Sequence, residues 1–194
     1  MFKRATGFMD VVAYSGTGVA GRTVAHNLGV APAWMVIKCR NYARNWCTYH
    51  ISLGNGYQII LNSSAVKEST ALWNSTTPTA TEFTLGNDGD VNGSPSSSFG
   101  NSYIAYLFAT LAGVSKVGTY TATGSNLNVD CGFTGGARFI LIKRTDSAGD
   151  WYTYDSLRGI VAGNDPYLLL NSSAAEVTNT DYIDPLNAGF TVTS

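Results

Sequence analysis

The sequence predicts an all-β protein made of two tandem antiparallel β-sandwiches, jelly-roll or concanavalin-like, of which the second copy lacks its last strand. Three observations lead to this prediction. Short segments rich in Val, Ile, Tyr, Thr and Phe alternate with turns rich in Gly, Asn and Asp. No long segment keeps the apolar period of a helix. Most of the sequence also occurs twice, which indicates a duplicated domain.

The expected strands of the first copy combine β-branched and aromatic residues with an alternating pattern. They are residues 8–15, 22–27, 34–40, 46–51, 57–61, 81–85 and 102–109. The second copy repeats the scheme at residues 117–123, 127–131, 139–144, 151–155 and 167–170. Only residues 64–73 and 172–177 have a sequence that could hold a helical turn. So many short strands per copy predict a two-layer sandwich, and the lack of a Cys-Trp-Cys framework argues against the immunoglobulin topology.

Three blocks of sequence return at a nearly constant distance. Residues 34–38 (WMVIK) and 45–50 (NWCTYH) return 105 residues later as 139–143 (FILIK) and 150–155 (DWYTYD). Residues 59–65 (IILNSSA) return 109 residues later as 168–174 (LLLNSSA), so the loop before this block is longer in the second copy. A solenoid repeat has roughly 20–50 residues. This longer period instead suits a complete small domain of about 100–150 residues.

The two ends of the chain do not coincide with the ends of a copy. Residues 107–116 match residues 1–10, so the chain opens with the end of an earlier repeat. The second copy stops after the counterpart of residues 82–85 and before any counterpart of residues 101–109. Either the chain is part of a longer array, or the first residues of a neighbouring chain complete the second copy by strand addition.

The expected division of the chain follows from these ends. Residues 1–9 are a terminal strand of a preceding repeat or an exchanged arm, residues 10–112 the first repeat, and residues 113–194 the second, incomplete repeat.

The composition argues against some classes of binding partner. With 44% hydrophobic and 12% aromatic residues, the chain can bury a core. Charged residues make up 13% and the net charge is −1, with scattered Lys and Arg, so the sequence carries no footprint for nucleic acid. Its apolar runs are far shorter than the ~20 residues that span a bilayer, so no membrane insertion is expected. Few charges and much Gly, Ser, Thr and Asn favour an external, β-rich surface protein, located outside the cell.

The sequence contains few residues that could form a catalytic site. The histidines are His26 and His50, and the second copy has Cys131 and Asp155 in their places. No Gly-x-Ser-x-Gly elbow presents a serine nucleophile, and the glutamates form no close pair of the kind that glycosidases use. His26 is therefore expected to end a strand and bind a turn carbonyl, and no enzymatic activity is predicted.

Two features concern cysteine and metal chemistry. Cys39 and Cys47 flank a hairpin loop symmetrically, so a disulfide across the hairpin is one interpretation and two free thiols the other. Asp88, Asp90 and Asn92 match the opening of a calcium loop, although the twelfth position is Phe99 instead of a glutamate. The alternative for these three residues is a turn between strands. No other cofactor is expected.

Aromatic residues are the remaining candidates for a binding site. The pairs Trp46 with Tyr49 and Trp151 with Tyr154 recur in both copies, either as sugar-stacking platforms or as core anchors. Alternation in a strand places the two members of each pair on opposite faces. Lys38 and Lys143 also recur, and are expected near the mouths of hairpins. Phe2, Phe8 and Phe190, near the ends of the chain, are candidate assembly residues.

Several linked blocks carry a resemblance to a known kind of domain. They are residues 23–38, 45–50, 61–65, Leu72-Trp73-Asn74, and Val91-Asn92-Gly93 followed by 103–109. Together they resemble a tandem, lectin-like β-sandwich domain of bacteriophage tail-fibre and other virion proteins. The second copy departs from this pattern at residues 131–136, which replace the His26 block.

The resemblance implies a virion structural protein, such as a tail fibre, spike or surface decoration. Its partners would be other copies of itself, other virion proteins and host-surface glycans, and the resemblance supplies no catalytic residue. Two alternatives come from other classes of protein. One is a carbohydrate-binding module of a glycan-active enzyme, and the other is the subunit of a self-assembling extracellular β-filament.

Overall fold

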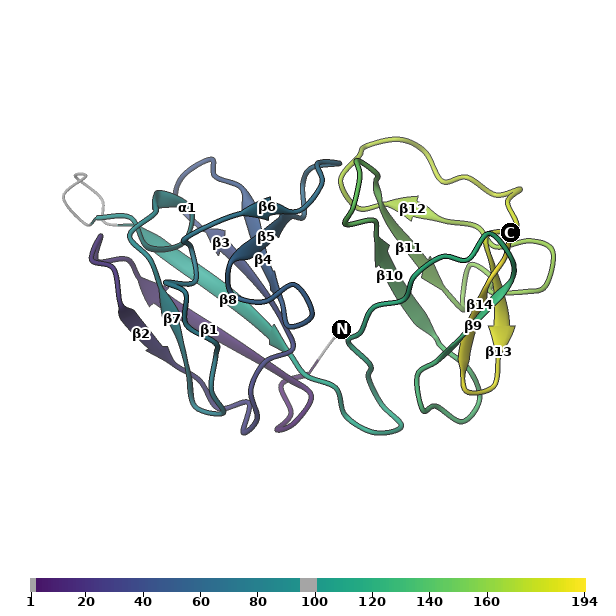
Figure 1. The fold of residues 1–194 in the computed structure, drawn as a ribbon, viewed down its shortest axis with the longest axis horizontal. Coiled ribbons are helices and arrows are strands. Elements are labelled where there is room, and N and C mark those ends of the chain that lie inside the picture. The colour runs from purple at the N-terminus through teal and green to yellow at the C-terminus, as the bar shows by residue number, and fades with distance from the viewer. Residues whose placement is uncertain (1–2, 95–100) are drawn as a thin grey trace.

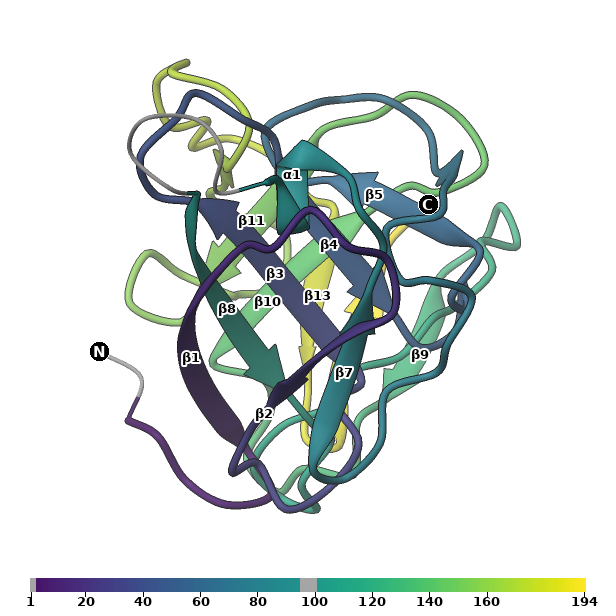
Figure 2. The ribbon, with the colours of Figure 1, turned by 90° about the vertical axis from the view of Figure 1, so that its left-hand side faces the viewer.

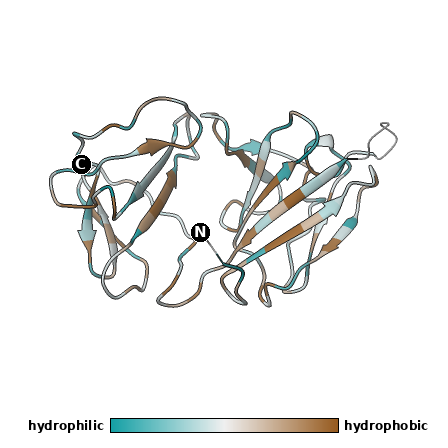
Figure 3. Cartoon of the chain, turned by 180° about the vertical axis from the view of Figure 1, so that it is seen from behind, coloured by the Kyte–Doolittle hydropathy of each residue, from teal (hydrophilic) through white to brown (hydrophobic). Residues whose placement is uncertain are grey.

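A computed structural model describes residues 3–94 and 101–194, and it confirms the all-β sandwich prediction. The chain forms two β-rich lobes that lie side by side, one for each copy of the repeat (Figure 1). Figure 3 shows hydrophobic and hydrophilic residues following one another in short bands along the strands, as expected of sheets with one buried face. In the described part of the chain, no helix is long and apolar enough to cross a membrane.

The first repeat contains eight strands and one short helix. They are β1 (Met9–Ser15), β2 (Arg22–Ala25), β3 (Trp34–Cys39), β4 (Trp46–His50), β5 (Tyr57–Ile60), β6 (Glu68–Ser69), β7 (Glu82–Leu85), α1 (Gly89–Asn92) and β8 (Ser102–Phe108). Six strands form one antiparallel sheet in the order β1-β8-β3-β4-β5-β6, and β2 pairs with β7. Figure 2 shows β2 and β7 crossing in front of the larger sheet, which makes two layers.

The core of the first repeat lies between these two layers. Along β8, Tyr103, Ala105 and Leu107 are fully buried and alternate with half-buried residues, as strand periodicity requires. They pack in one cluster with Phe83 of β7 and with Trp73, whose indole N–H donates to the Tyr57 carbonyl at 2.8 Å. Because β8 lies between β1 and β3, it holds the centre of the sheet.

The second repeat reproduces part of this plan. Its strands are β9 (Leu127–Asp130), β10 (Phe139–Lys143), β11 (Trp151–Asp155), β12 (Leu168–Leu169), β13 (Ile183–Leu186) and β14 (Gly189–Val192). One sheet has the order β10-β11-β12 and the other β13-β14-β9. Val129 of β9 faces Phe190 of β14, as Val24 of β2 faces Phe83 of β7. The pairing therefore supports the alignment of the two copies that the sequence suggested.

One predicted strand of the second repeat does not form. Residues 117–123 were expected to correspond to β1, but they carry no strand. In the first repeat β1 pairs only with β8, whereas among the described residues of the second repeat no strand lies on the free side of β10. A segment without a ladder partner cannot join a sheet. Consistently, Phe139 of β10 is 51% exposed, whereas its counterpart Trp34 stacks on Phe108 of β8 at 5.0 Å.

The short elements differ from those read from the sequence in three places. Residues 64–73 and 172–177 hold no helix, and the short helix α1 lies at Gly89–Asn92 instead. The two-residue strand β6 was not expected. Nor was β13. Its Pro185 has no N–H to donate to a sheet ladder, and it faces Phe190 in the β13–β14 hairpin.

The cysteines are free, and Cys39 and Cys47 are buried. The register of β3 and β4 places Ile37 opposite Cys47, so the two cysteines do not face each other.

The first described residues form a turn. Ala5 and Met9 make an isolated antiparallel bridge, and Leu111 and Ser115 make the same bridge 106 residues later. Gly7 and its counterpart Gly113 have φ angles of 77° and 72°, a region that favours glycine. This turn packs on its own repeat, since Gly7 N–H donates to the Leu28 carbonyl at 2.7 Å. Residues 1–2 lie outside the described residues, and exchange of this arm between chains stays a prediction.

Candidate functional site

The two repeats meet at a joint that centres on Trp151. Its side chain is 4% exposed, yet it belongs to neither of the two core clusters. Trp151 opens β11, where the side chains of Tyr152 and Tyr154 pack with the second core. Because neighbouring side chains alternate, Trp151 points away from that core and toward the first repeat. Its indole N–H donates to the carbonyl of Ile60, at the end of β5, at 3.0 Å.

The turn that follows β5 supplies most of the other contacts of the joint. Lys143 Nζ and the Gly149 N–H both donate to the carbonyl of Ser64, at 3.4 and 2.8 Å. The Lys67 N–H donates to the carbonyl of Thr145 at 3.4 Å. Lys143, Thr145 and Gly149 all lie on the hairpin that β10 and β11 form, which reaches toward the first repeat in Figure 1. We call it the second hairpin.

Local sequence gives this turn, residues 60–65, a defined shape. The Ser63 N–H donates to the Ile60 carbonyl at 3.2 Å, and the Ala65 N–H to Ser63 Oγ at 3.1 Å. The side-chain amide oxygen of Asn62 accepts from the Trp46 N–H at 2.9 Å, which ties the turn to β4. Within this turn, the carbonyls of Ile60 and Ser64 also accept hydrogen bonds from the second repeat. A Ser or Asn side chain that bonds to nearby backbone favours such turns.

His50 lies on another part of the same joint. Its ring is hydrogen bonded to the backbone of Gly118 in the second repeat, and its Nδ1 accepts from the Ser52 N–H at 3.2 Å. Burial lowers the pKa of His50, and the bond to Gly118 partly offsets this effect. The joint therefore depends on neutral or backbone groups more than on charge pairs.

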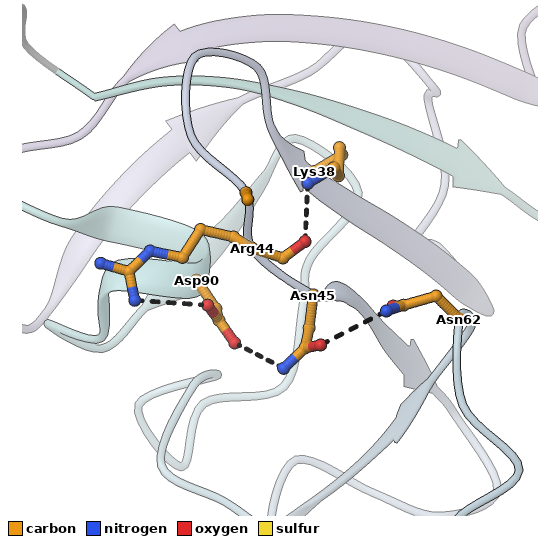
Figure 4. Close-up of a pocket in the computed structure, with 6 residues that line it drawn as sticks. Lys38, Arg44, Asn45, Asn62 and Asp90 are labelled. Carbon is orange, nitrogen blue, oxygen red and sulfur yellow. Dashed lines mark hydrogen bonds and ion pairs between the residues drawn. The ribbon is translucent and has the colours of Figure 1, made fainter.

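The first repeat carries an equivalent hairpin between β3 and β4, the first hairpin, with a different environment. Trp46, the counterpart of Trp151, is half-buried, and Lys38 Nζ lies 5.9 Å from the centre of its ring. An open pocket beside it is lined by Lys38, Ala43, Arg44, Asn45, Asn62 and Asp90 (Figure 4). Lys38 Nζ donates to the Arg44 carbonyl at 2.6 Å. The Arg44 side chain points away from that bond, toward Asp90 of α1.

The structure separates the four predicted glycan-binding residues. Tyr49 and Tyr154 are 1% and 2% exposed, and each belongs to the core of its own repeat. Burial raises the pKa of both phenols. Trp151 is covered by the first repeat, so Trp46 alone among the four is not buried and keeps part of its side chain exposed. The four residues are not brought together into a single site.

The predicted calcium residues take part in protein hydrogen bonds. Asp88 caps α1 by accepting from the Asp90 N–H at 2.7 Å. The buried Asn92 side chain accepts from the Thr17 N–H at 2.8 Å and donates to the carbonyls of Gly86 and Val19. Asp90 pairs with Arg44 and Asn45, and Phe99 lies outside the described residues. Over residues 3–94 and 101–194, no three His, Cys, Asp or Glu side chains come together to hold a metal ion.

The three candidate assembly residues occupy different environments. Phe190 is 7% exposed and lies in the second core, with the ring of Tyr120 edge-on at 6.4 Å. Phe8 is half-buried, and its carbonyl accepts from the Ala109 N–H at 2.9 Å. Phe2 lies outside the described residues. No common surface of these residues is visible in the described part of the chain.

His26 occupies the position expected from the sequence. It follows β2 directly and is 6% exposed. Its Nε2 lies 3.3 Å from the carbonyl of Thr79, and its Nδ1 accepts from the Leu28 N–H at 3.2 Å. Burial lowers the pKa of His26. Cys131, its counterpart, is half-buried.

The joint was not predicted from the sequence, although the sequence blocks that form it recur in both copies. Both Trp151 and the Asn-Ser-Ser-Ala block recur, which is the signal that could have pointed to it. The contacts, however, mainly join side chains or amides of one repeat to backbone carbonyls of the other. Backbone carbonyls are present at every residue, so side-chain identity does not mark those that bind.

Comparisons with known proteins give one match. A family profile described as a domain of unknown function (DUF7483) matches residues 3–194. No curated protein and no solved structure matches the chain.

Proposed function

The chain belongs to the DUF7483 family, and we propose that it is a structural protein of a bacteriophage virion, as a part of a tail fibre, spike or surface decoration. The observation that carries this proposal is the joint between the repeats. Consecutive sandwiches are held by a buried tryptophan and by backbone hydrogen bonds across the joint. Such a joint fixes the direction of each repeat relative to the next, which suits an extended virion part.

The contacts of the joint fit this role physically. A buried tryptophan provides a large apolar contact and one polar group, its indole N–H. In Trp151 this N–H is hydrogen bonded to the Ile60 carbonyl. Direct hydrogen bonds to Ser64 and Thr145 then set the orientation, because they need correct angles as well as distances. The resemblance of the linked sequence blocks to virion proteins points to the same class of function.

The location of the protein in particles tests the proposal. Mass spectrometry of density-purified virions should detect peptides of this chain in a fixed ratio to a capsid protein. A matched preparation from which the particles have been removed by sedimentation serves as the control. A chain that stays in the supernatant and never sediments with particles would contradict the virion role.

Contact with host-surface glycans is a second candidate function. The half-buried Trp46 favours it, because its neighbours Lys38 and Asn45 line a polar pocket. A glycan array would show binding that Trp46→Ala abolishes and that Tyr49→Phe, a change in the core, leaves intact. A reducing-sugar assay separates this role from that of a glycan-active enzyme. Turnover that His50→Ala abolishes would contradict the structural role.

A further inference from the structure

The second repeat carries its own copy of the turn that the joint uses. Residues 169–174 have the same local hydrogen bonds as residues 60–65. The Ser172 N–H donates to the Leu169 carbonyl at 3.2 Å, and the Ala174 N–H donates to Ser172 Oγ at 3.0 Å. Asn171 ties this turn to β11 by accepting from the Trp151 N–H at 2.8 Å. The carbonyls of Leu169 and Ser173 are therefore placed like those of Ile60 and Ser64.

This second turn lies on the surface. Leu170 is 50% exposed, whereas its counterpart Leu61 is half-buried, and residues 172–176 are all exposed. The bonds that shape the turn come from within the second repeat. It thus has its binding geometry in place before a partner arrives, which lowers the entropic cost of binding.

The first repeat carries the other half of the joint. Lys38 and Trp46 of the first hairpin correspond to Lys143 and Trp151 of the second, 105 residues later. In both hairpins the lysine donates to a carbonyl of its own loop, at Arg44 in the first and at Arg144 in the second. The half-buried Trp46 therefore occupies the position from which Trp151 reaches the Ile60 carbonyl.

We propose that two copies of this chain bind head to tail, with the 169–174 turn of one copy seated on Lys38 and Trp46 of the next. In this contact Trp46 donates to the Leu169 carbonyl and Lys38 to the Ser173 carbonyl, as Trp151 and Lys143 do inside the chain. The polar pocket in Figure 4 is the part of the first repeat beside which this turn lies. The inference deepens the proposed structural role, because it names the surface through which the chain extends an array.

The symmetry of the contact predicts the kind of assembly. The two surfaces lie on different repeats, so each bound copy leaves one turn and one hairpin available. A heterologous contact of this kind forms open filaments, or rings if the rotation closes. Analytical ultracentrifugation of the purified chain should therefore show a ladder of species that lengthens with concentration.

Single substitutions test each half of the contact. Trp46→Ala removes the hydrogen bond and most of the packing, and Ser173→Arg places a bulky cation opposite Lys38. Each should weaken association at least ~10-fold, as expected for a residue at the centre of an interface. Trp46→Phe keeps a ring without the N–H and should fall between Trp46→Ala and the wild type. Ser125→Arg adds the same charge at an exposed serine elsewhere and should change nothing.

Mixing the variants makes the test independent of folding losses. The Trp46→Ala chain keeps its 169–174 turn, and the Ser173→Arg chain keeps its first hairpin. Each alone should stay monomeric, whereas an equimolar mixture should form a one-to-one dimer and nothing longer. A misfolded variant cannot restore binding in this way.

Three results would contradict the proposed interface. The first is a wild-type chain that stays monomeric up to roughly millimolar concentration. The second is association that neither variant weakens, and the third is a glycan that binds at Trp46 while no self-association occurs. The virion role is judged separately by particle mass spectrometry. A chain found in particles but monomeric in solution contradicts this interface alone, and a polymerising chain missing from particles contradicts the virion role alone.

Discussion

At the scale of single residues, buried polar side chains tie the loops of the first repeat to its sheet. Asn92 is fully buried and joins the loop after β1 to the end of β7 through Thr17, Val19 and Gly86. An unsatisfied buried polar group costs about 1–3 kcal/mol, so such a side chain persists only where each of its atoms is bonded. The acidic and amide residues that matched a calcium loop therefore have a structural role in the described molecule.

Asp10 provides the residue-scale prediction, because its charge is almost completely buried. Its carboxylate accepts from the Asn27 and Val11 N–H groups and from Arg4 Nε, and its side chain is 3% exposed. Burial alone would raise the pKa of Asp10, but the bonds from Asn27, Val11 and Arg4 lower it below 3.8 overall. Arg4 is 58% exposed, so the two backbone bonds provide most of the stabilisation.

The pH dependence follows from that lowered pKa. The carboxylate stabilises the fold fully at pH values well above 3.8, and this contribution is lost as the pH falls through the folded-state pKa. Asp10→Ala should lower the free energy of unfolding by ~1–3 kcal/mol at neutral pH and less under acid conditions. Urea denaturation at several pH values measures this difference. Asp146, an exposed carboxylate that also pairs with an arginine, gives the control Asp146→Ala, which should change little. An equal loss at acid and neutral pH would contradict the role of the charge.

At the scale of elements, the two repeats differ chiefly in the strand beside β3 and β10. In the first repeat β8 covers β3 over six paired residues and is antiparallel to it. In the described second repeat β10 pairs only with β11, and the second core is correspondingly smaller. A strand at the edge of a sheet, as β10 is among the described residues, presents backbone groups that another strand can bind.

A peptide with the sequence of residues 101–109 should bind this edge of β10. The same sequence covers the equivalent strand β3 inside the first repeat, and main-chain hydrogen bonds supply affinity in strand addition. Hydrogen exchange should show new protection of the β10 amides when the peptide is present, with a scrambled peptide of equal composition as the control. Absence of protection up to roughly millimolar peptide would contradict the prediction.

At the scale of the whole molecule, the joint connects the two repeats energetically. Trp151→Ala should lower the free energy of unfolding by ~3 kcal/mol, because truncation of a buried tryptophan leaves a cavity. Trp151→Phe keeps much of the packing and should lose only the hydrogen bond to Ile60, about 1 kcal/mol. Urea denaturation followed by circular dichroism measures both losses.

The repeat itself supplies a matched control for that measurement. Trp46→Ala truncates the same residue at the equivalent position of the first repeat, where the ring is only half-buried. In dilute protein it should therefore cost clearly less than Trp151→Ala. Equal losses for the two variants would mean that the first repeat does not cover Trp151 as described.

The sequence alone determined the class of the fold and the alignment of the two repeats. Alternating apolar residues, turn chemistry and the return of whole blocks are local signals, and strands such as β4, β8 and β11 lie within a residue of where they were expected. Even the position of His26 after a strand could be read from its neighbours.

Only the tertiary structure decided which copy of a repeated residue is buried, and by what. Trp46 and Trp151 lie in the same local sequence, but Trp46 stays half-buried beside Lys38, whereas Trp151 is buried against the neighbouring repeat. Likewise, residues 117–123 have the composition of a strand and form none, because a strand needs a partner as well as a propensity. Burial and pairing depend on groups distant in the chain, so a local pattern cannot specify them.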